Sequence, residues 1–208
     1  MFVFVVLISL CYAATEAATP CCTHRRFQAT LLELGGQTNL TSGVGSAIAH
    51  SMRMYYDYDN QRQFIISTPR PPSQEKGYRM FQDFVTRKSY YLSAVGSTLY
   101  CTVLNMQPEE TMPPPCVQAN ATLKGSHYFG SAGQNVQAHT WSYYDENQVN
   151  IETTVTDDEC TPLSVTSSGL IRGFGRTTTM LFLDFKAGIS EVYRMQIPAI
   201  CERPAVGK

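Results

Sequence analysis

The chain has 208 residues, a formal net charge of −1 at pH 7 and 43% hydrophobic residues. A single all-β sandwich or barrel commonly reaches this length, so we expect one domain rather than two small ones. The basic residues are scattered along the chain, which argues against nucleic acid as a partner because phosphate binding needs clustered Lys and Arg.

The N-terminus reads MFVFVVLISLCYAATEAA. An uncharged apolar run over residues 2–10, followed by small residues, is typical of a secretory signal peptide. We expect residues 1–18 to be this signal peptide, with cleavage between Ala13 and Ala18, and residues 19–208 to form the mature domain. The run is too short to span a bilayer, which takes about 20 apolar residues.

Alternating apolar and polar residues predict strands in the first half of the mature chain. Residues 27–34 are a candidate strand, and residues 35–45 are predicted to form a loop rich in Gly, Thr and Ser. Residues 48–56 and 61–67 alternate on either side of a polar turn, which predicts a hairpin. Residues 90–95 and 99–104, around Gly96-Ser97, predict another.

A proline-rich connector, residues 107–116, leads to residues 119–133, which we predict to be a loop. The clearest strand pattern follows, in residues 135–160. One arm contains Trp141, and the second arm alternates with a strict period of two, so a long hairpin is expected. Residues 161–168 and 177–185 are further strands around a Gly-rich turn, and residues 188–197 are ambiguous between a short helix and a strand.

Six cysteines remain after the expected signal peptide takes Cys11 with it. They predict three disulfides in an oxidising compartment, because no CxxC pair begins a zinc site. Six cysteines allow fifteen pairings, so counting leaves the connectivity open. The six are Cys21, Cys22, Cys101, Cys116, Cys160 and Cys201. The sequons at Asn39 and Asn120 predict surface glycosylation.

No catalytic motif is found. The chain contains no GxSxG, HExxH, P-loop or GxGxxG pattern, and its histidines lack metal-ligand spacing. We therefore expect no enzymatic activity, no cofactor and no metal ligand. His50 is expected to be a core or cavity-wall histidine with a satisfied hydrogen bond. Arg172 and Arg176 are interpreted as solvated loop residues, and the acidic groups at residues 57–60 and 157–159 as surface turns that do not match an EF-hand.

Taken together, the cysteine placement, the sequons and the last strands resemble the ependymin-related family of secreted glycoproteins. The most specific parts are residues 136–160, which end in Asp-Glu-Cys, and residues 182–189 (FLDFKAGI) leading to residues 198–201 (PAIC). The resemblance covers most of the chain after the signal peptide. It implies a mainly β fold of two stacked antiparallel sheets that form a half-open barrel with a hydrophobic pocket, similar to bacterial lipoprotein carriers (LolA/LolB-like).

The resemblance also implies a role and a set of disulfides. The implied role is the binding of a lipid or fatty acid outside the cell or in the lysosomal lumen, often as a homodimer and with a link to calcium. The implied pairs are Cys101 with Cys201 and Cys160 with Cys21 or Cys22, which leaves Cys116 for the other. The alternative role is that of an extracellular matrix or cell-adhesion protein acting through protein contacts.

Apolar residues on the predicted strand faces are the candidates for the pocket wall. Judged one at a time, each is explained more simply as packed core, whereas the resemblance favours a pocket for the set. The candidates are Met52, Met54, Tyr56, Phe64, Ile66, Phe84, Trp141, Val149, Ile151, Val155, Leu181, Leu183 and Phe185. A sixteen-carbon chain in such a pocket would gain on the order of 10 kcal/mol from burial, before association costs.

Overall fold

The computed structural model describes residues 18–69, 77–95, 98–108, 110–131, 133–171 and 173–202. The expected signal peptide, apart from residue 18, lies outside these residues. Eleven strands form one antiparallel sheet in the order β6-β5-β4-β3-β2-β1-β11-β10-β9-β8-β7. The expected mainly β class is therefore confirmed.

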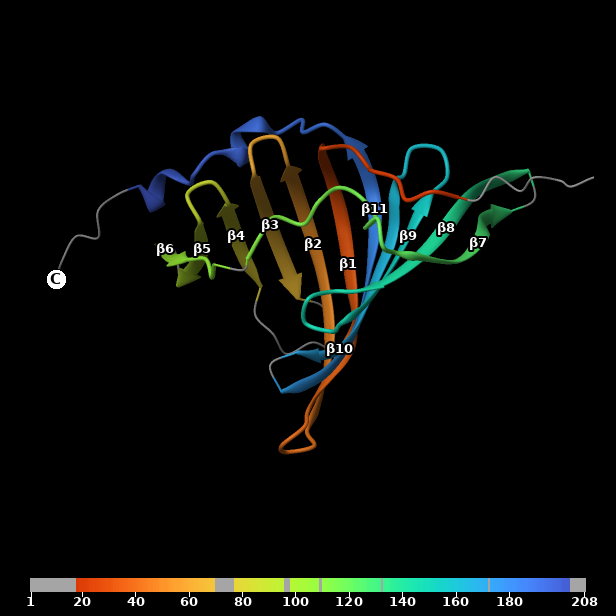
Figure 1. Ribbon diagram of the computed structural model, residues 1–208. Helices are drawn as coiled ribbons and strands as arrows, with labels where there is room; N and C mark the ends of the chain where they lie inside the picture. The colour runs from red at the N-terminus through yellow and green to blue at the C-terminus, as the bar shows by residue number, and fades with distance from the viewer. Residues whose placement is uncertain are drawn as a thin grey trace, which may run out of the picture.

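The two halves of the chain form the two sides of this sheet. The first half supplies β1 (Arg26–Asn39), β2 (Gly45–Asp57), β3 (Arg62–Pro69), β4 (Tyr78–Asp83), β5 (Lys88–Val95) and β6 (Thr98–Asn105). The second half supplies β7 (Thr122–Ser131), β8 (Gln134–Tyr144), β9 (Asn150–Thr156), β10 (Pro162–Ile171) and β11 (Phe174–Ala187). Because β1 pairs with both β2 and β11, the two expected sheets are joined into one curved sheet that stays open between β6 and β7 (Figure 1).

The strands fan out at one end of the molecule and converge at the other (Figure 1). At the narrow end the β1–β2 hairpin meets the β10–β11 hairpin, where the Leu40 amide donates to the Gly173 carbonyl oxygen at 3.2 Å. Gly35 lies near this end, opposite Thr178 on β11. A Cβ at Gly35 would lie 2.2 Å from the Thr177 carbonyl oxygen, so this close approach of β1 and β11 requires glycine.

Three predicted loops differ from the structure. The loop expected at residues 119–133 is wrong, because most of it forms β7 along the edge of β8. The loop at residues 35–45 is shorter than expected, since β1 continues to Asn39 and β2 begins at Gly45. The Gly-rich turn at residues 169–175 is also mostly strand, since β10 ends at Ile171 and β11 begins at Phe174. In each case pairing with a neighbouring strand overrides weak local β propensity.

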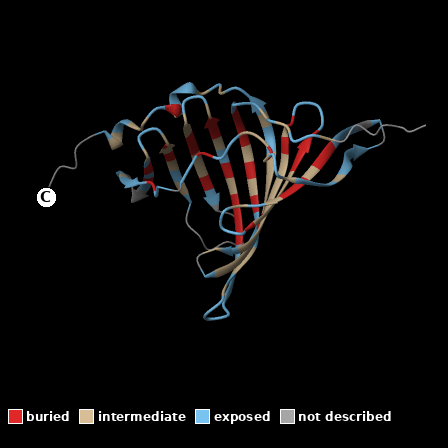
Figure 2. Ribbon diagram, viewed as in Figure 1, coloured by how far each residue is buried: buried red, intermediate tan, exposed pale blue. Residues whose placement is uncertain are grey.

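The outer face of β2–β5 is covered by the C-terminal segment. This segment contains two short 3-10 helices, η1 (Val192–Met195) and η2 (Ala199–Cys201). Residues 188–197, predicted as either a short helix or a strand, contain η1 and no strand. Met195 packs on an outer cluster of buried side chains, which consists of Tyr55, Phe64, Phe81, Tyr90 and Leu92. Along these strands buried residues alternate with less buried ones (Figure 2). A hydrogen bond of 2.7 Å from the Tyr55 hydroxyl to Glu191 holds the segment against the sheet.

Three disulfides connect distant parts of the chain. They join Cys21 to Cys160, Cys22 to Cys116 and Cys101 to Cys201. These are the pairings that the resemblance implied, with Cys160 bonded to Cys21. Such bonds fit an extracellular protein. Within the residues described above, no helix has the length and apolar character needed to cross a membrane.

Candidate ligand-binding cavity

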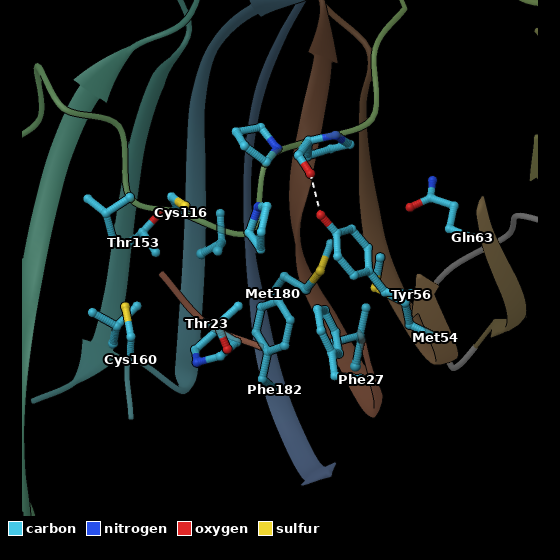
Figure 3. A pocket seen from close by; sticks show the side chains of 18 of the residues that line it. Thr23, Phe27, Met54, Tyr56, Gln63, Cys116, Thr153, Cys160, Met180 and Phe182 are labelled. Atoms are coloured by element: carbon cyan, nitrogen blue, oxygen red, sulfur yellow. Dashed lines mark hydrogen bonds between the residues drawn. The ribbon is translucent and has the colours of Figure 1, made fainter. Parts of the chain in front are cut away.

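An apolar cavity of about 380 Å³ lies on the concave face of the sheet (Figure 3). Small-molecule sites typically occupy about 300–1,000 Å³, so this volume suits a small ligand. Strands from both sides of the sheet line the cavity, together with the loop between β6 and β7 and the N-terminal segment. The lining residues are Thr23, Phe27, Leu31, Met52, Met54, Tyr56, Gln63, Ile65, Pro113, Pro114, Pro115, Cys116, Val117, Tyr143, Thr153, Val155, Cys160, Pro162, Val165, Met180 and Phe182.

The strand register explains why residues so distant in sequence meet here. Leu31 on β1 lies between Phe182 on β11 and Met52 on β2. In the adjacent row Val165 on β10 lies opposite Met180 on β11. Residues directly opposed on antiparallel strands point to the same face of the sheet. The rows therefore present apolar side chains to the concave side, although the second row continues on β1 into Glu33.

The loop between β6 and β7 passes in front of β3, β2 and β1 (Figure 1) and contributes residues 113–117 to the cavity lining. We call residues 110–117 the strap. The Tyr56 hydroxyl, which points from β2 toward the strap in Figure 3, donates to the Pro113 carbonyl oxygen at 2.6 Å. Pro113, Pro114 and Pro115 have no backbone N–H, so this part of the strap can face an apolar space without leaving a donor unsatisfied.

The N-terminal segment fixes the far end of the strap. The Cys22–Cys116 disulfide joins the two. Beside it, the Thr23 amide donates to the Pro115 carbonyl oxygen at 2.7 Å, and the Val117 amide donates to a carbonyl oxygen of the same N-terminal segment at 2.9 Å. The strap is therefore held by Tyr56 on one side and by a covalent bond on the other.

The polar groups of the wall are uncharged. Burial raises the pKa of the Tyr56 phenol, with a smaller contribution from Tyr58. Burial also raises the pKa of Tyr143. Both phenols are therefore neutral at physiological pH. Thr23 is different, because its hydroxyl oxygen is buried and has no hydrogen-bond partner within the described part of the chain.

The structure brings some of the predicted wall residues together in the cavity and places others elsewhere. Met52, Met54, Tyr56 and Val155 line the cavity. Phe84 and Phe185 pack against the apolar cluster that contains Met52 and Tyr56, and Trp141 packs with Val155 and Cys160. The remaining candidates lie on the outer face or away from the lining; they are Phe64, Ile66, Val149, Ile151, Leu181 and Leu183.

A bulge in β11 explains which of its residues reach the cavity. Register is lost between Gln28 and Thr30 on β1, so two residues of β11 oppose one of β1. Asp184 in the bulge has φ 50°. A bulge reverses the facing of the residues that follow it. Phe182 and Phe185 therefore both point inward, whereas Leu183 is 45% exposed on the outer face.

Several lining residues were not among the sequence candidates. Phe27 and Leu31 on β1 alternate with Gln28 and Thr30, so the period-two pattern could have identified them. The strap prolines carry no such signal, because their position over the cavity depends on a disulfide and on a hydroxyl from another strand.

Charged residues on the concave side pair with one another. Arg176 donates to Glu33 at 2.7 Å, and His50 Nδ1 lies 3.4 Å from the same carboxylate. Buried His50 thus has a polar partner, as expected. The interpretation of Arg176 as a solvated loop residue is wrong, because β11 begins before it and carries it to Glu33.

Ser126, His139 and Asp157 form a hydrogen-bonded chain near the β7 edge. Ser126 Oγ lies 2.8 Å from His139 Nδ1, and His139 Nε2 lies 2.7 Å from Asp157 Oδ1. None of the three lines the cavity. Sequence spacing gave no sign of this set, since each residue comes from a different strand or turn.

A second, more polar pocket of about 330 Å³ adjoins the cavity and shares Thr23 and Cys160 with it. It contains His24, Asp158 and Glu159. Hydrogen bonds from the Thr156 hydroxyl and the Glu159 amide lower the pKa of Asp158, so this carboxyl stays ionised at neutral pH. Within the described residues, no group of three or more His, Cys, Asp or Glu is arranged to hold a metal ion.

The fold and the cavity define a half-open, antiparallel β protein with an apolar interior site. The Ependymin family model matches residues 73–201, and the chain belongs to the Ependymin family. It is 26% identical to Ependymin-related protein 2 of Haliotis asinina over 97% of this chain and 99% of the relative. It is 28% identical to Ependymin-related protein 1 of the same organism, over 70% of this chain and 75% of the relative.

Two bacterial structures show partial similarity to this chain. An uncharacterized conserved protein from Thermus thermophilus has 13% identity and a TM-score of 0.49, over 88% of this chain and 87% of that one. A LolA superfamily protein from Nitrosomonas europaea has 9% identity and a TM-score of 0.32, over 81% of this chain and 90% of that one.

Proposed function

We propose that this chain is a secreted, non-catalytic glycoprotein that binds a hydrophobic ligand in the cavity on the concave face. The observation that carries the proposal is the cavity itself, with its apolar wall and its anchored strap. Protein interiors are normally packed to high density, so an open apolar space of about 380 Å³ indicates an occupant. Each buried methylene of a ligand would contribute about 0.8 kcal/mol.

The proposed route to the outside of the cell rests on three features. Residues 1–18 would act as a signal peptide, and residues 19–208 would form the mature single domain. The three disulfides suit an oxidising compartment. Asn120 is exposed in a turn before β7, and Asn39 ends β1 at the narrow tip, so both sequons lie where a glycan can be attached.

Ligand binding is tested by native mass spectrometry of gently purified protein and by titration with the uncharged fluorescent probe N-phenyl-1-naphthylamine. Met180→Trp places a larger side chain in the cavity and is expected to weaken probe binding by about tenfold, equivalent to about 1.4 kcal/mol. Leu183→Trp is the matched control, because Leu183 lies on the outer face of the same strand. Absence of any co-purified lipid, together with no probe binding, would contradict the proposal.

The non-catalytic part of the proposal has its own test. A hydrolase needs a nucleophile activated by a base, and Ser126 with His139 is a hydrogen-bonded pair of that kind. We expect a fluorophosphonate probe to leave Ser126 unmodified. Labelling of Ser126 that is lost in His139→Gln would show an activated serine and overturn the non-catalytic assignment.

The second candidate function is adhesion through protein contacts, including assembly of two copies. It is favoured by apolar side chains along both edges of the sheet: Leu99, Tyr100, Val103 and Leu104 on β6, and Tyr128 and Phe129 on β7 are exposed. Unpaired edge strands with apolar side chains can pair with another chain. Light scattering of wild type and of Leu104→Lys would reveal an assembly through β6.

A further inference from the structure

The cavity contains hydrogen-bonding groups but no charge. Among the described lining residues there is no Lys, Arg, His, Asp or Glu. Its polar members are hydroxyls and one carboxamide, and four of them are already engaged. Tyr56 donates to the strap, the Gln63 side chain donates to Gln82, and the Tyr143 and Thr153 side chains share a hydrogen bond. The buried Thr23 hydroxyl, at the junction with the second pocket, has no partner among the described residues.

Among the described residues, the cations nearest the cavity are already paired. Arg25, whose charge acts on Tyr56, is bonded to Asp59. Glu33, His50 and Arg176 lie on the same face of the sheet, but the Arg176 guanidinium is already paired with the Glu33 carboxylate. The second pocket presents the Asp158 and Glu159 carboxylates instead. The one basic group in that pocket is His24, which lies 3.9 Å from Glu159.

We infer that the cavity selects uncharged single-chain lipids, such as long-chain alcohols and primary amides, over ionised fatty acids. This inference rests on the proposed function and names its ligand class. A carboxylate in an apolar site without a counter-charge is unstable and takes up a proton instead. A hydroxyl or amide head carries no such cost, and the Thr23 hydroxyl can exchange one hydrogen bond with it.

The test compares dodecanol with dodecanoic acid as competitors of N-phenyl-1-naphthylamine on the wild-type protein between pH 5.5 and 7.5. Dodecanol is expected to bind with the same affinity throughout. The apparent affinity of the acid is expected to fall by about tenfold per pH unit, because only its protonated form enters. Equal, pH-independent displacement by both compounds would overturn the inference and leave the proposed function standing, whereas failure of both the probe and the competitors would contradict the proposed function itself.

A pair of adjacent substitutions provides a second measurement. Phe182→Lys introduces a cation into the wall, so it should raise the ratio of acid to alcohol affinity by about tenfold at pH 7.5, the effect of one favourable charge contact worth about 1.4 kcal/mol. Leu183→Lys adds the same charge on the outer face and should leave the ratio unchanged. Equal ratios in both variants, with the folded state verified by circular dichroism, would overturn the inference. If Phe182→Lys does not fold, the wild-type pH comparison alone decides.

Thr23→Val examines the proposed contact with the head group. The substitution keeps the side-chain shape and removes the hydroxyl, so dodecanol should bind about fivefold more weakly, as expected for one net hydrogen bond. Binding of N-phenyl-1-naphthylamine should not change. If the variant binds dodecanol as tightly as wild type, the Thr23 hydroxyl does not contact the head group of the ligand.

Discussion

The hydroxyl of Tyr56 connects the sheet to the strap by one hydrogen bond, to the carbonyl oxygen of Pro113. We expect Tyr56→Phe to lower the free energy of unfolding by about 1 kcal/mol, the net value of one such bond, and to accelerate ligand release because the strap loses its contact with β2. Urea denaturation and stopped-flow release of the fluorescent probe measure the two effects. Tyr58→Phe is the control, since the Tyr58 ring stacks on Tyr56, whereas the hydrogen bond to Pro113 comes from Tyr56. Equal release rates in the two variants would exclude this role of the hydroxyl.

Glu191 gives the C-terminal segment a pH-dependent contact. A hydrogen bond from Arg194, followed by one from the Tyr55 hydroxyl, lowers the pKa of Glu191. A carboxyl with a lowered folded-state pKa stabilises the protein above its ordinary pKa of about 4.3, and this contribution is lost as the pH falls through the lowered value.

We therefore expect Glu191→Gln to be less stable than wild type at pH 7, with the difference disappearing as the pH falls well below 4. Urea denaturation across this range measures it. Glu146→Gln, in the exposed turn between β8 and β9, removes the same charge and should show no such pH-dependent difference. A stability gap for Glu191→Gln that persists unchanged at low pH would show that the carboxylate is not its source.

The strap and the C-terminal segment cover opposite faces of the sheet, and each is fixed by one disulfide. Cys22–Cys116 closes a separation of 94 residues and Cys101–Cys201 one of 100. Because chain-entropy stabilisation depends on loop length, replacing either pair by alanines should cost a similar free energy, about 2–4 kcal/mol. Only loss of Cys22–Cys116 should accelerate ligand release. The comparison is made by measuring probe release from the two double-alanine variants well below their melting temperatures. Faster release from both variants would show that retention of the ligand does not depend on the strap.

The sequence predicted the strands that have one apolar and one polar face. β9 is an example, and its hairpin with β8 forms as expected. For β3 and β11, the sequence could not show which side chains point toward the cavity, because both faces of these strands carry apolar residues. On β3, Phe64 faces the C-terminal segment, while Gln63 and Ile65 face the cavity. The outward cover comes from residues far along the chain, so local periodicity could not reveal it.

For the same reason, the cavity could be expected only as a class of site. Met52, Met54 and Tyr56 were assigned to one face of β2, and they line the cavity. The position of the strap over the cavity could not be predicted, because the sequence QPEETMPPPC is equally consistent with any irregular connector. The role of β7 was hidden as well, since its glycine and serine residues resemble a loop until the edge of β8 pairs with them.

The shape of the molecule follows from a sheet that is wide at one end and narrow at the other. The open side of the curve is bridged by the strap, so the cavity volume depends on how tightly the narrow end holds the two halves together. β1 lies at the centre of the sheet and pairs with both halves. Gly35 and Gly36 are consecutive on β1, and they differ in how closely their neighbours approach.

A methyl group at Gly35 would meet the backbone of β11, with 2.2 Å to the Thr177 carbonyl oxygen and 2.7 Å to Thr178 Cα. At Gly36 the nearest contact would be 3.4 Å, to the Ser46 carbonyl oxygen. We expect Gly35→Ala to lower the free energy of unfolding by about 2–3 kcal/mol, because backbone cannot move aside as a side chain can, and Gly36→Ala to change it by less than about 1 kcal/mol. Urea denaturation of both variants tests this. Since separation of β1 from β11 would also move Leu31 away from Phe182 in the cavity wall, Gly35→Ala should weaken probe binding as well. If stability and probe binding are both unchanged in Gly35→Ala, the close approach of β1 and β11 at Gly35 does not determine the shape of the cavity.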